Sequence, residues 1–467
     1  MQLRNWSFLL FVLVGLLALV ALAPACGGDD DDDDDASDDD DDDDAGVDCE
    51  DGLCILTGTI KSDVTMTADN EYLLSGGVFI GDDATSATLT IEAGTRIYGE
   101  SSSNGMLVIS RGSKIMAEGT ADAPIVFSSS KSDGSRARGD WGGLILNGRA
   151  PVNNCNAGTD AAFCEALGEG GTGFYGGDDP DDSSGVLNYV RVEFAGRILS
   201  PDNELNGIAF QGVGRGTEVD NIHVHMNKDD GVEFFGGTVN VKHIIITGVA
   251  DDMLDWTDGW TGKVQYAVLQ QYSDAGDNGI EADNSGEDNT ATPRSHPTIS
   301  NVTIIGSGSD EFSSDGMRLR EGTAANIYNA AVMNFAGSCV KVANVETYEN
   351  AWDTDHLSGE LTIMNSRVTC DTNFKDEYDF EEDGETKIPG PFTVADDLFG
   401  ADDAGNSTGD LGLTDPTNTT SPNWAPEGGS ALLGAGAAPD DSFFDDADYI
   451  GAIGSDDWTT WTEFPAN

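Results

Sequence analysis

The sequence predicts an all-β fold: a right-handed parallel β-helix, or solenoid, with inserted loops and a C-terminal cap. Two short motifs recur along the body of the chain with a smallest spacing of about 22 residues. Each repeat holds two or three short apolar runs separated by Gly, Asn or Asp, and 59 Gly against 14 Pro fit many tight turns. Long apolar runs with the 3.6-residue period of helical repeats are missing from the sequence. Corresponding residues of successive coils should therefore stack about 4.8 Å apart.

Residues 1–25 are typical of a secretory signal peptide. Arg4 supplies a positive charge, an apolar stretch covers residues 8–22, and an Ala-Pro-Ala sequence precedes Cys26. This junction resembles a bacterial lipoprotein cleavage site, in which the Cys receives a diacylglyceryl group. The resemblance implies lipidation of Cys26 and attachment to the outer membrane or cell surface. Ordinary cleavage, which would give a secreted protein with a free Cys26, is the alternative.

The cysteine count agrees with lipidation. The chain has 7 Cys, and an odd number leaves one unpaired in an oxidising compartment. Without Cys26, the remaining six form three close couples, and proximity predicts these disulfides: Cys49 with Cys54, Cys155 with Cys164, and Cys339 with Cys370.

Residues 26–54 are predicted to be an extended tether. Residues 29–44 hold fourteen Asp in two runs of seven, which repel one another and stay hydrated. A calcium-binding tail is the alternative, although poly-Asp lacks the Gly turns of a defined calcium loop. The whole chain has 22 basic and 85 acidic residues, a formal net charge of −63. We expect no nucleic-acid partner, because such a field repels phosphate backbones.

Residues 55–370 are predicted to form the β-helix, with about eleven coils. The first repeated motif starts at residues whose type is Asn or Asp: Asn206, Asp230, Asp252, Asn278 and Asp315. The second motif runs in phase with the first and starts at Tyr189, Asn221, His243, Tyr266, Asn301, Asn329 and Asn365. Spacings longer than the minimum indicate loops that leave the coils.

Three segments are expected to depart from regular coils. Residues 147–186 are rich in Gly and Asp and are predicted to be an inserted loop. Residues 371–425 are acidic and are predicted to be a loop region. Residues 426–467 regain aromatic side chains and are predicted to cap the last coil, whose strand edges would otherwise be exposed.

Several segments together resemble a family of mostly uncharacterised secreted or lipid-anchored bacterial β-helix proteins. They are residues 117–127, 139–148, 175–180 and 448–454, with Trp458 and Trp461. The resemblance covers nearly all of residues 57–467. It implies a surface location and this fold, but it brings no activity and no catalytic residues.

The Asn and Asp residues that begin the first motif are expected to hold turns between coils, since their side chains bond neighbouring backbone amides. Strand alternation then turns Val232, Leu254 and their equivalents inward and a row of polar residues outward. The outward row is Glu233, Asp255, Glu281 and Arg318.

Three carboxylates in adjacent coils are unfavourable unless they are solvated, protonated or bridged by a cation. A solvated acidic stripe is one interpretation. A calcium site is another, because calcium prefers oxygen ligands. Its candidate ligands are Asp229, Asp230, Asp251, Asp252, Asp255 and Asp258, and Asp277 lies on the same face or its flanking turns.

Catalysis is a third interpretation, with Glu233, Asp255, Glu281 and Arg318 as candidates. Adjacent carboxyls about 5 Å apart suit a retaining glycosidase, and those two coils apart suit an inverting one. A polysaccharide lyase would instead need calcium beside a basic proton acceptor, for which Arg318 or Arg320 would serve. The five His do not converge on a metal-binding spacing.

The sequence therefore favours a surface-exposed cell-envelope lipoprotein with a binding or structural role that is not enzymatic. It would contact an extracellular glycan or a surface protein, and calcium is its expected structural ion. The alternative is a carbohydrate-active enzyme, a polysaccharide lyase or a glycoside hydrolase, that acts along the acidic stripe.

Overall fold

The computed structural model describes residues 46–465 except 161–162, 201–202, 352–358, 382 and 385. The expected signal peptide, Cys26, most of the tether and His356 lie outside the described residues. Within the described part, no helix has the length and apolar character needed to cross a membrane.

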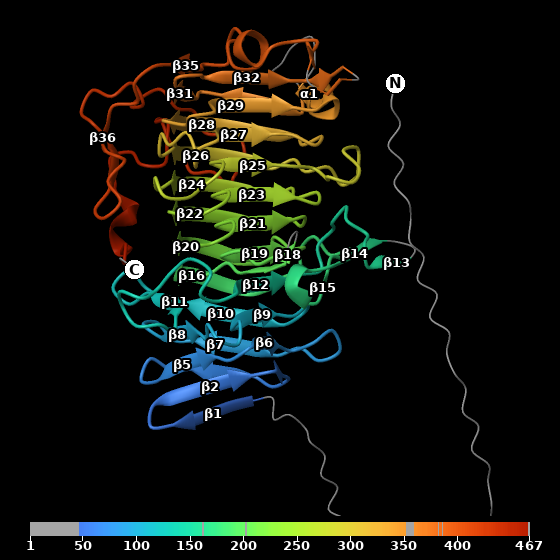
Figure 1. Ribbon diagram of the computed structural model, residues 1–467, viewed down its shortest axis with the longest axis vertical. Helices are drawn as coiled ribbons and strands as arrows, with labels where there is room; N and C mark the ends of the chain where they lie inside the picture. The colour runs from blue at the N-terminus through green and yellow to red at the C-terminus, as the bar shows by residue number, and fades with distance from the viewer. Residues whose placement is uncertain are drawn as a thin grey trace, which may run out of the picture. The chain divides into compact units, whose positions relative to one another are not determined.

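The body is a stack of coils, and the parallel β-helix predicted from the repeats is confirmed (Figure 1). One face is an eleven-stranded parallel sheet, in agreement with about eleven coils. Its strands are β3 (Thr59–Ile60), β6 (Gly77–Ile80), β9 (Met106–Ile109), β12 (Gly143–Asn147), β19 (Ile208–Gln211), β21 (Val232–Phe235), β23 (Leu254–Thr257), β25 (Ile280–Ala282), β27 (Asp315–Leu319), β29 (Ser338–Ala343) and β32 (Phe374–Glu377).

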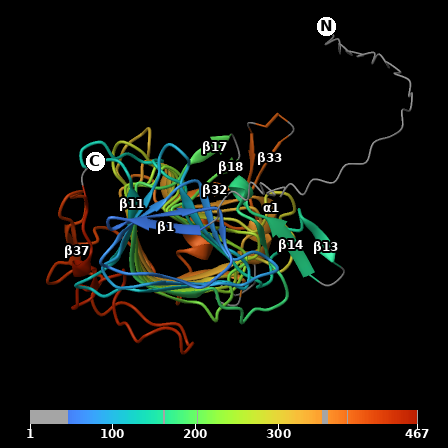
Figure 2. The same cartoon turned by 90° about the horizontal axis from the view of Figure 1, so that it is seen from below.

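The other faces belong to one seventeen-stranded sheet. Its strands are β1 (Gly46–Glu50), β2 (Leu53–Thr57), β4 (Val64–Met66), β5 (Glu71–Leu74), β7 (Thr88–Ile91), β8 (Arg96–Gly99), β10 (Lys114–Glu118), β11 (Ile125–Ser129), β16 (Gly185–Glu193), β20 (Glu218–His225), β22 (Asn240–Thr247), β24 (Lys263–Gln270), β26 (Thr298–Ile305), β28 (Ala325–Met333), β30 (Leu361–Met364), β31 (Arg367–Thr369) and β35 (Ser407–Thr408). Seen along the stack, the two sheets enclose the core (Figure 2).

Long strands of the seventeen-stranded sheet turn a corner at one residue with a left-handed backbone. These corner residues begin the second repeated motif, and their φ values lie between 48° and 65°: Tyr189, Asn221, His243, Tyr266, Asn301, Asn329 and Asn365. Asn is the commonest of them because its short polar side chain tolerates this conformation. The register places His243 over Asn221, as the repeat alignment predicts.

The core lies inside the coils. Val232, Leu254, Ile280 and Met317 are buried there, as the alternation predicts. Large aromatic side chains fill the middle of the stack, and the rings of Phe234 and Trp260 lie 4.0 Å apart in a stacked arrangement. All three disulfides predicted from proximity are confirmed.

Short elements leave the coils. They are β13 (Gly158–Asp160), β14 (Phe163–Leu167), the 3₁₀ turn η1 (Glu169–Gly171), β15 (Phe174–Tyr175), β17 (Ile198–Ser200), β18 (Asn203–Glu204), α1 (Val345–Ala351), β33 (Asp379–Phe380), β34 (Lys387–Ile388), the π-helical turn η3 (Val394–Leu398), β36 (Leu413–Asp415), β37 (Asn423–Pro426) and the 3₁₀ turn η4 (Trp458–Trp461). The insert that contains β13, β14 and β15 agrees with the loop expected at residues 147–186.

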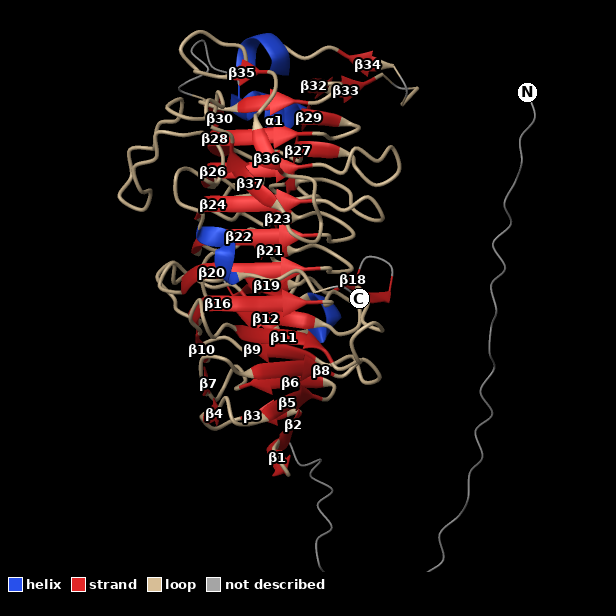
Figure 3. Cartoon of the chain, turned by 90° about the vertical axis from the view of Figure 1, so that its left-hand side faces the viewer, coloured by secondary structure: helices blue, strands red, loops and turns tan. Residues whose placement is uncertain are grey.

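The C-terminal end differs from the arrangement expected from the sequence. The last coil is closed by α1 and the segment around η3, whose Tyr348, Phe392, Leu398 and Phe399 join the core. Residues 411–465, here called the strap, instead run back along the outer face of the seventeen-stranded sheet (Figure 3). They do so because that face carries apolar side chains that the strap covers: Ile245, Val268 and Ile305 pack against Trp424, Ala452 and Ile453.

Buried polar pairs also fix the strap. The side chain of Gln265 bonds the backbone of Asp445 in both directions, at 3.0 and 2.8 Å. Asn301 donates to the carbonyl of Tyr449 at 2.9 Å. The corner residue Asn301 therefore both turns its strand and binds the strap.

The end of the strap covers two buried histidines of β20, His223 and His225. The carbonyl of Pro465 can only accept, so His225 Nε2 donates to it, at 3.1 Å. The Thr247 hydroxyl then donates to His225 Nδ1 at 2.8 Å and accepts from His223 Nε2 at 3.0 Å. His223 Nδ1 in turn accepts from the Thr462 hydroxyl. This chain of hydrogen bonds is complete when both imidazoles are neutral, the form that their burial favours.

Candidate functional site

One outward row of side chains runs the length of the eleven-stranded sheet and changes character in blocks. The register stacks Thr59, Phe79, Val108, Ile145, Ala209, Glu233, Asp255, Glu281, Arg318, Lys341 and Lys375. Four apolar residues are followed by three acidic and three basic ones. The structure thus brings Glu233, Asp255, Glu281 and Arg318 together in adjacent strands, labelled β21, β23, β25 and β27 in Figure 1.

A second acidic layer lies at the starts of the same strands. Asp230 Oδ1 accepts the backbone amide of Asp252 at 2.9 Å, and Asp252 Oδ1 accepts that of Asn278 at 2.6 Å. Asn278 continues the pattern to Asp315 at 3.1 Å. These side chains therefore hold successive coils in register, as the turn interpretation predicts. Because each Asp uses one oxygen in this way, its other oxygen can face the acidic row.

Together these residues line a groove of about 370 Å³, here called the acidic groove. Ten carboxylates and two guanidinium groups line it: Glu169, Glu204, Asp229, Asp230, Glu233, Asp251, Asp252, Asp255, Asp277, Glu281, Arg318 and Arg320. Four overlapping triads have ligand oxygens within 4.8 Å of one another: Asp229–Asp230–Asp251, Asp230–Glu233–Asp255, Asp251–Asp252–Asp277 and Asp252–Asp255–Glu281.

Burial makes this charge density costly. It raises the pKa of Glu233 and Asp255 well above the usual range, and the neighbouring carboxylates Asp230 and Glu233 raise them further. Burial, with the charge of Asp251, raises the pKa of Asp229 to about 8. Glu233 and Asp255 keep part of their surface in solvent, so water offsets part of this cost, and protons or a nearby cation would offset the rest.

Two arginines close one end of the acidic groove. Arg318 Nη1 lies 3.3 Å from Glu281 Oε1, and Arg320 pairs with both Glu281 and Asp283. Although burial alone would lower the pKa of Arg320, these carboxylates raise it. Arg320 is thus held as a cation, which disfavours it as a proton acceptor.

The residues fit a calcium ion. Oδ1 of Asp255 is buried and has no hydrogen-bond partner within the described part of the chain, although its neighbours are carboxylates. Oxygen-only ligands drawn from carboxylates are the set that Ca²⁺ prefers. A cation held by Asp230, Glu233 and Asp255, or by Asp252, Asp255 and Glu281, would satisfy that oxygen and offset the repulsion.

One family model and one solved structure are similar to this chain. Residues 58–410 match the family model described as a pectate-lyase-like β-helix domain. The chain belongs to this family. The crystal structure of the periplasmic alginate epimerase AlgG is similar at 11% identity, covering 70% of this chain and 78% of that chain, with a TM-score of 0.24. No curated protein matches the sequence.

In this pectate-lyase-like β-helix, one of the sequence-predicted calcium ligands lies elsewhere. Asp258 follows β23, at the end away from the acidic groove. Its carboxylate accepts hydrogen bonds from Tyr175 at 2.9 Å and from Asn154 at 3.0 Å, both in the inserted loop. Asp258 is therefore a buried anchor for the insert, and the acidic groove takes its other members from the turns before the strands.

Two residues of the acidic groove were missed by the sequence analysis. Glu169 lies on η1 and Glu204 on β18, in two inserts that pack together: Gly170 N donates to Asn203 Oδ1 at 2.7 Å. Inserts lie outside the repeat, so no periodic signal places them over the row. They add negative charge to the acidic groove, with Glu169 acting on Glu233 and Glu204 on Asp251.

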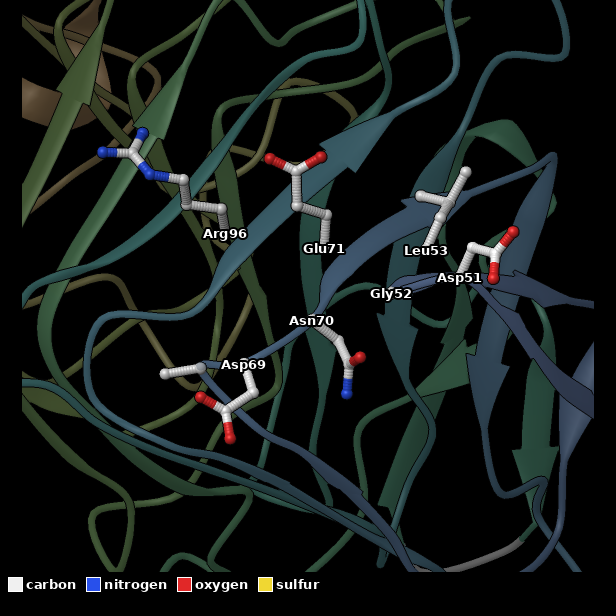
Figure 4. Close-up of a pocket in the computed structure, with 8 residues that line it drawn as sticks. Asp51, Gly52, Leu53, Asp69, Asn70, Glu71 and Arg96 are labelled. Carbon is white, nitrogen blue, oxygen red and sulfur yellow. The ribbon is translucent and has the colours of Figure 1, made fainter.

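Another hollow lies at the N-terminal end of the stack (Figure 4). It has a volume of about 430 Å³ and is lined largely by turn residues near Asp51 and Asp69. The close-up shows the side chains of Asp51 and Arg96 on opposite sides of it. The carboxylates here do not form a triad of the kind found in the acidic groove.

Proposed function

We propose that this protein is a calcium-binding protein of the bacterial cell envelope that contacts an extracellular glycan through its acidic groove. The observation that carries the proposal is the set of four overlapping carboxylate triads around the unpartnered Asp255 oxygen. The groove has an entirely polar lining, which suits a hydrated ligand with many oxygens. An acidic glycan would be repelled by the carboxylates alone, so the ion would bridge the two.

The glycan test uses a panel of acidic polysaccharides, including polygalacturonate and alginate, immobilised on a surface. We expect binding of the purified protein with millimolar calcium and at least a tenfold loss when calcium is chelated. Glu233→Gln/Asp255→Asn should lose binding to a similar degree, because it removes Asp255, which two triads share, and Glu233 from one of those triads.

The matched control is Asp122→Asn/Asp402→Asn, which removes the same charge from exposed turns. It should bind as the unchanged protein does. Binding that is indifferent to calcium, or equal losses in the two double variants, would count against a specific bridging ion.

A second candidate function is a polysaccharide lyase or glycoside hydrolase. The observation in its favour is that Glu233 and Asp255 lie in adjacent coils within a carboxylate triad, close to the separation used by retaining glycosidases. The same polysaccharide mixtures separate the two functions when reducing ends and unsaturated uronates are measured. If the protein turns over a polysaccharide and Glu233→Gln abolishes the turnover, the protein is an enzyme and the binding-only function is wrong.

The proposed location is outside the cytoplasm, with a lipid anchor at Cys26 as the membrane contact. Three disulfides support an oxidising compartment. Cys26→Ala should move the protein from the membrane fraction to the soluble fraction, because a lipid attached to Cys26 is expected to anchor the protein in the bilayer. Fractionation of cells followed by immunodetection measures this, and membrane retention of the variant would argue against lipidation.

A further inference from the structure

A small pocket lies between the inserted loop and the early coils. It is formed where β15 crosses the early coils, and its volume is about 140 Å³. Its lining residues are Thr59, Phe79, Gly81, Asp82, Asp83, Ser110, Arg111, Asn147, Gly173 and Phe174. The space suits one ring-sized ligand rather than a long chain. It shares no lining residue with the acidic groove.

An unsatisfied polar atom points to a ligand here. Asn147 is 1% exposed, and its Nδ2 donates to the carbonyl of Thr172 at 2.7 Å. This bond fixes the amide orientation and leaves Oδ1 as the free acceptor, which has no partner among the described residues. A buried acceptor without a donor is unfavourable, so a hydroxyl donor in the pocket would satisfy it.

Aromatic rings supply an apolar surface beside this acceptor. Phe174 is 43% exposed although it belongs to a strand of the insert. Its ring lies 5.9 Å from the guanidinium carbon of Arg111, which fixes one side of it. Phe79, half-buried, lines the same pocket. An exposed ring next to hydroxyl and carboxyl groups suits a ligand with one apolar face and polar edges.

Charge at the pocket favours a neutral ligand. Asp82 pairs with Lys61 at 2.8 Å, and Arg111 pairs with both Asp83 and Glu165, at 2.9 and 2.6 Å. Three carboxylates thus face two cations. Because the cations are already paired and the local balance is negative, a uronate would be repelled where a neutral sugar would not.

We propose that this pocket binds the ring of a neutral pyranoside, which stacks on Phe174 and donates a hydroxyl to Asn147 Oδ1. The site is separate from the acidic groove and needs no metal. It would give the protein a second glycan contact, on the same sheet but several coils away. The register counts four steps from Phe79 to Glu233 along the outward row, or about 19 Å.

The test is saturation-transfer NMR with methyl β-D-glucopyranoside, methyl β-D-galactopyranoside and methyl α-D-mannopyranoside, each in the presence of a chelator. We expect transfer to the ring protons of at least one of them, and none to glucuronate. Phe174→Ala should weaken binding at least tenfold. Phe380→Ala, which truncates a similarly exposed Phe (37%) on β33, should leave binding unchanged.

Several outcomes would overturn the proposal. They are an absence of transfer from all three glycosides, stronger transfer from glucuronate, and equal effects of Phe174→Ala and Phe380→Ala. Both substitutions are at exposed positions, so circular dichroism should show an intact fold in each. Because the chelator removes calcium, failure of the calcium-dependent glycan contact would leave this result unaffected.

Discussion

Removal of calcium should destabilise the protein by about 3–4 kcal/mol, which is the linkage effect of an ion present at some hundred to a thousand times its Kd. The reason is the density of buried carboxylates in the acidic groove, where four triads share Asp230, Asp252, Asp255 and their neighbours. Thermal unfolding with calcium and with a chelator measures the effect, and we expect a shift in Tm of several degrees.

The double variant Glu233→Gln/Asp255→Asn tests whether the effect of calcium on stability comes from the acidic groove. Without calcium it should be more stable than the unchanged protein, because two repelling charges are gone. Calcium should then raise its Tm little or not at all. The control Asp122→Asn/Asp402→Asn should keep the full calcium response. A chelator without effect on the unchanged protein would contradict a structural ion in the acidic groove.

Acid should release the end of the strap. Burial lowers the pKa of His225 from its ordinary 6.5 to about 4, and burial also lowers the pKa of His223. Above pH 6.5 both imidazoles are neutral whether the strap is docked or not, so these groups give the docking free energy no pH dependence there. Between pH 6.5 and 4 only the undocked form takes up the proton. Docking should lose about 3 kcal/mol over this window.

The surroundings make a protonated imidazole unfavourable there. Arg191 and Arg138 add positive charge nearby, and Arg191 is already paired with Glu193 and Glu463. A proton on His225 Nδ1 would also remove the acceptor that the Thr247 hydroxyl uses. Tyr272 packs edge-on against the same ring.

Hydrogen-exchange protection factors of residues 459–464, which correct for the intrinsic pH dependence of amide exchange, and the fluorescence of Trp461 measure the release between pH 7 and 4. Local probes are needed because the acidic groove has raised pKa values in the same range, including about 6 for Asp251, and their protonation favours the folded state as the pH falls. His223→Gln/His225→Gln should make these protection factors independent of pH over this window. His296→Gln, on a histidine away from the strap, should retain the response. A strap that stays protected at pH 4 would contradict the prediction.

Repetition explains what could be predicted from the sequence. The pentapeptide motif places Glu233, Asp255 and Glu281 in one outward row, because strand alternation and coil register follow directly from the repeat. The same alignment predicts His243 over Asn221 and the Asn and Asp turns. Each of these features is local to one coil or shared by neighbouring coils.

The remaining features depend on contacts between distant parts of the chain. Glu169 and Glu204 reach the acidic groove from inserts, so no spacing in the sequence predicts their place. Asp258 follows the strand that carries Asp255, but Tyr175 of the insert binds it away from the other carboxylates. The strap carries Trp424 and Ile453 without a repeat, and its docking face is set by apolar and polar side chains of the seventeen-stranded sheet that lie far from it in the sequence.

The strap also changes how the solenoid transmits force and unfolds. In a simple solenoid each coil contacts only its neighbours, so coils can detach one at a time from either end. Here one covalent segment contacts successive strands from β16, through Arg191, to β28, through Asn329. These coils must separate from the strap before they separate from one another, which joins them into one cooperative block. The early coils from β2 to β11 lie outside that block, so a pull on the N-terminal end loads the least tied part of the stack first.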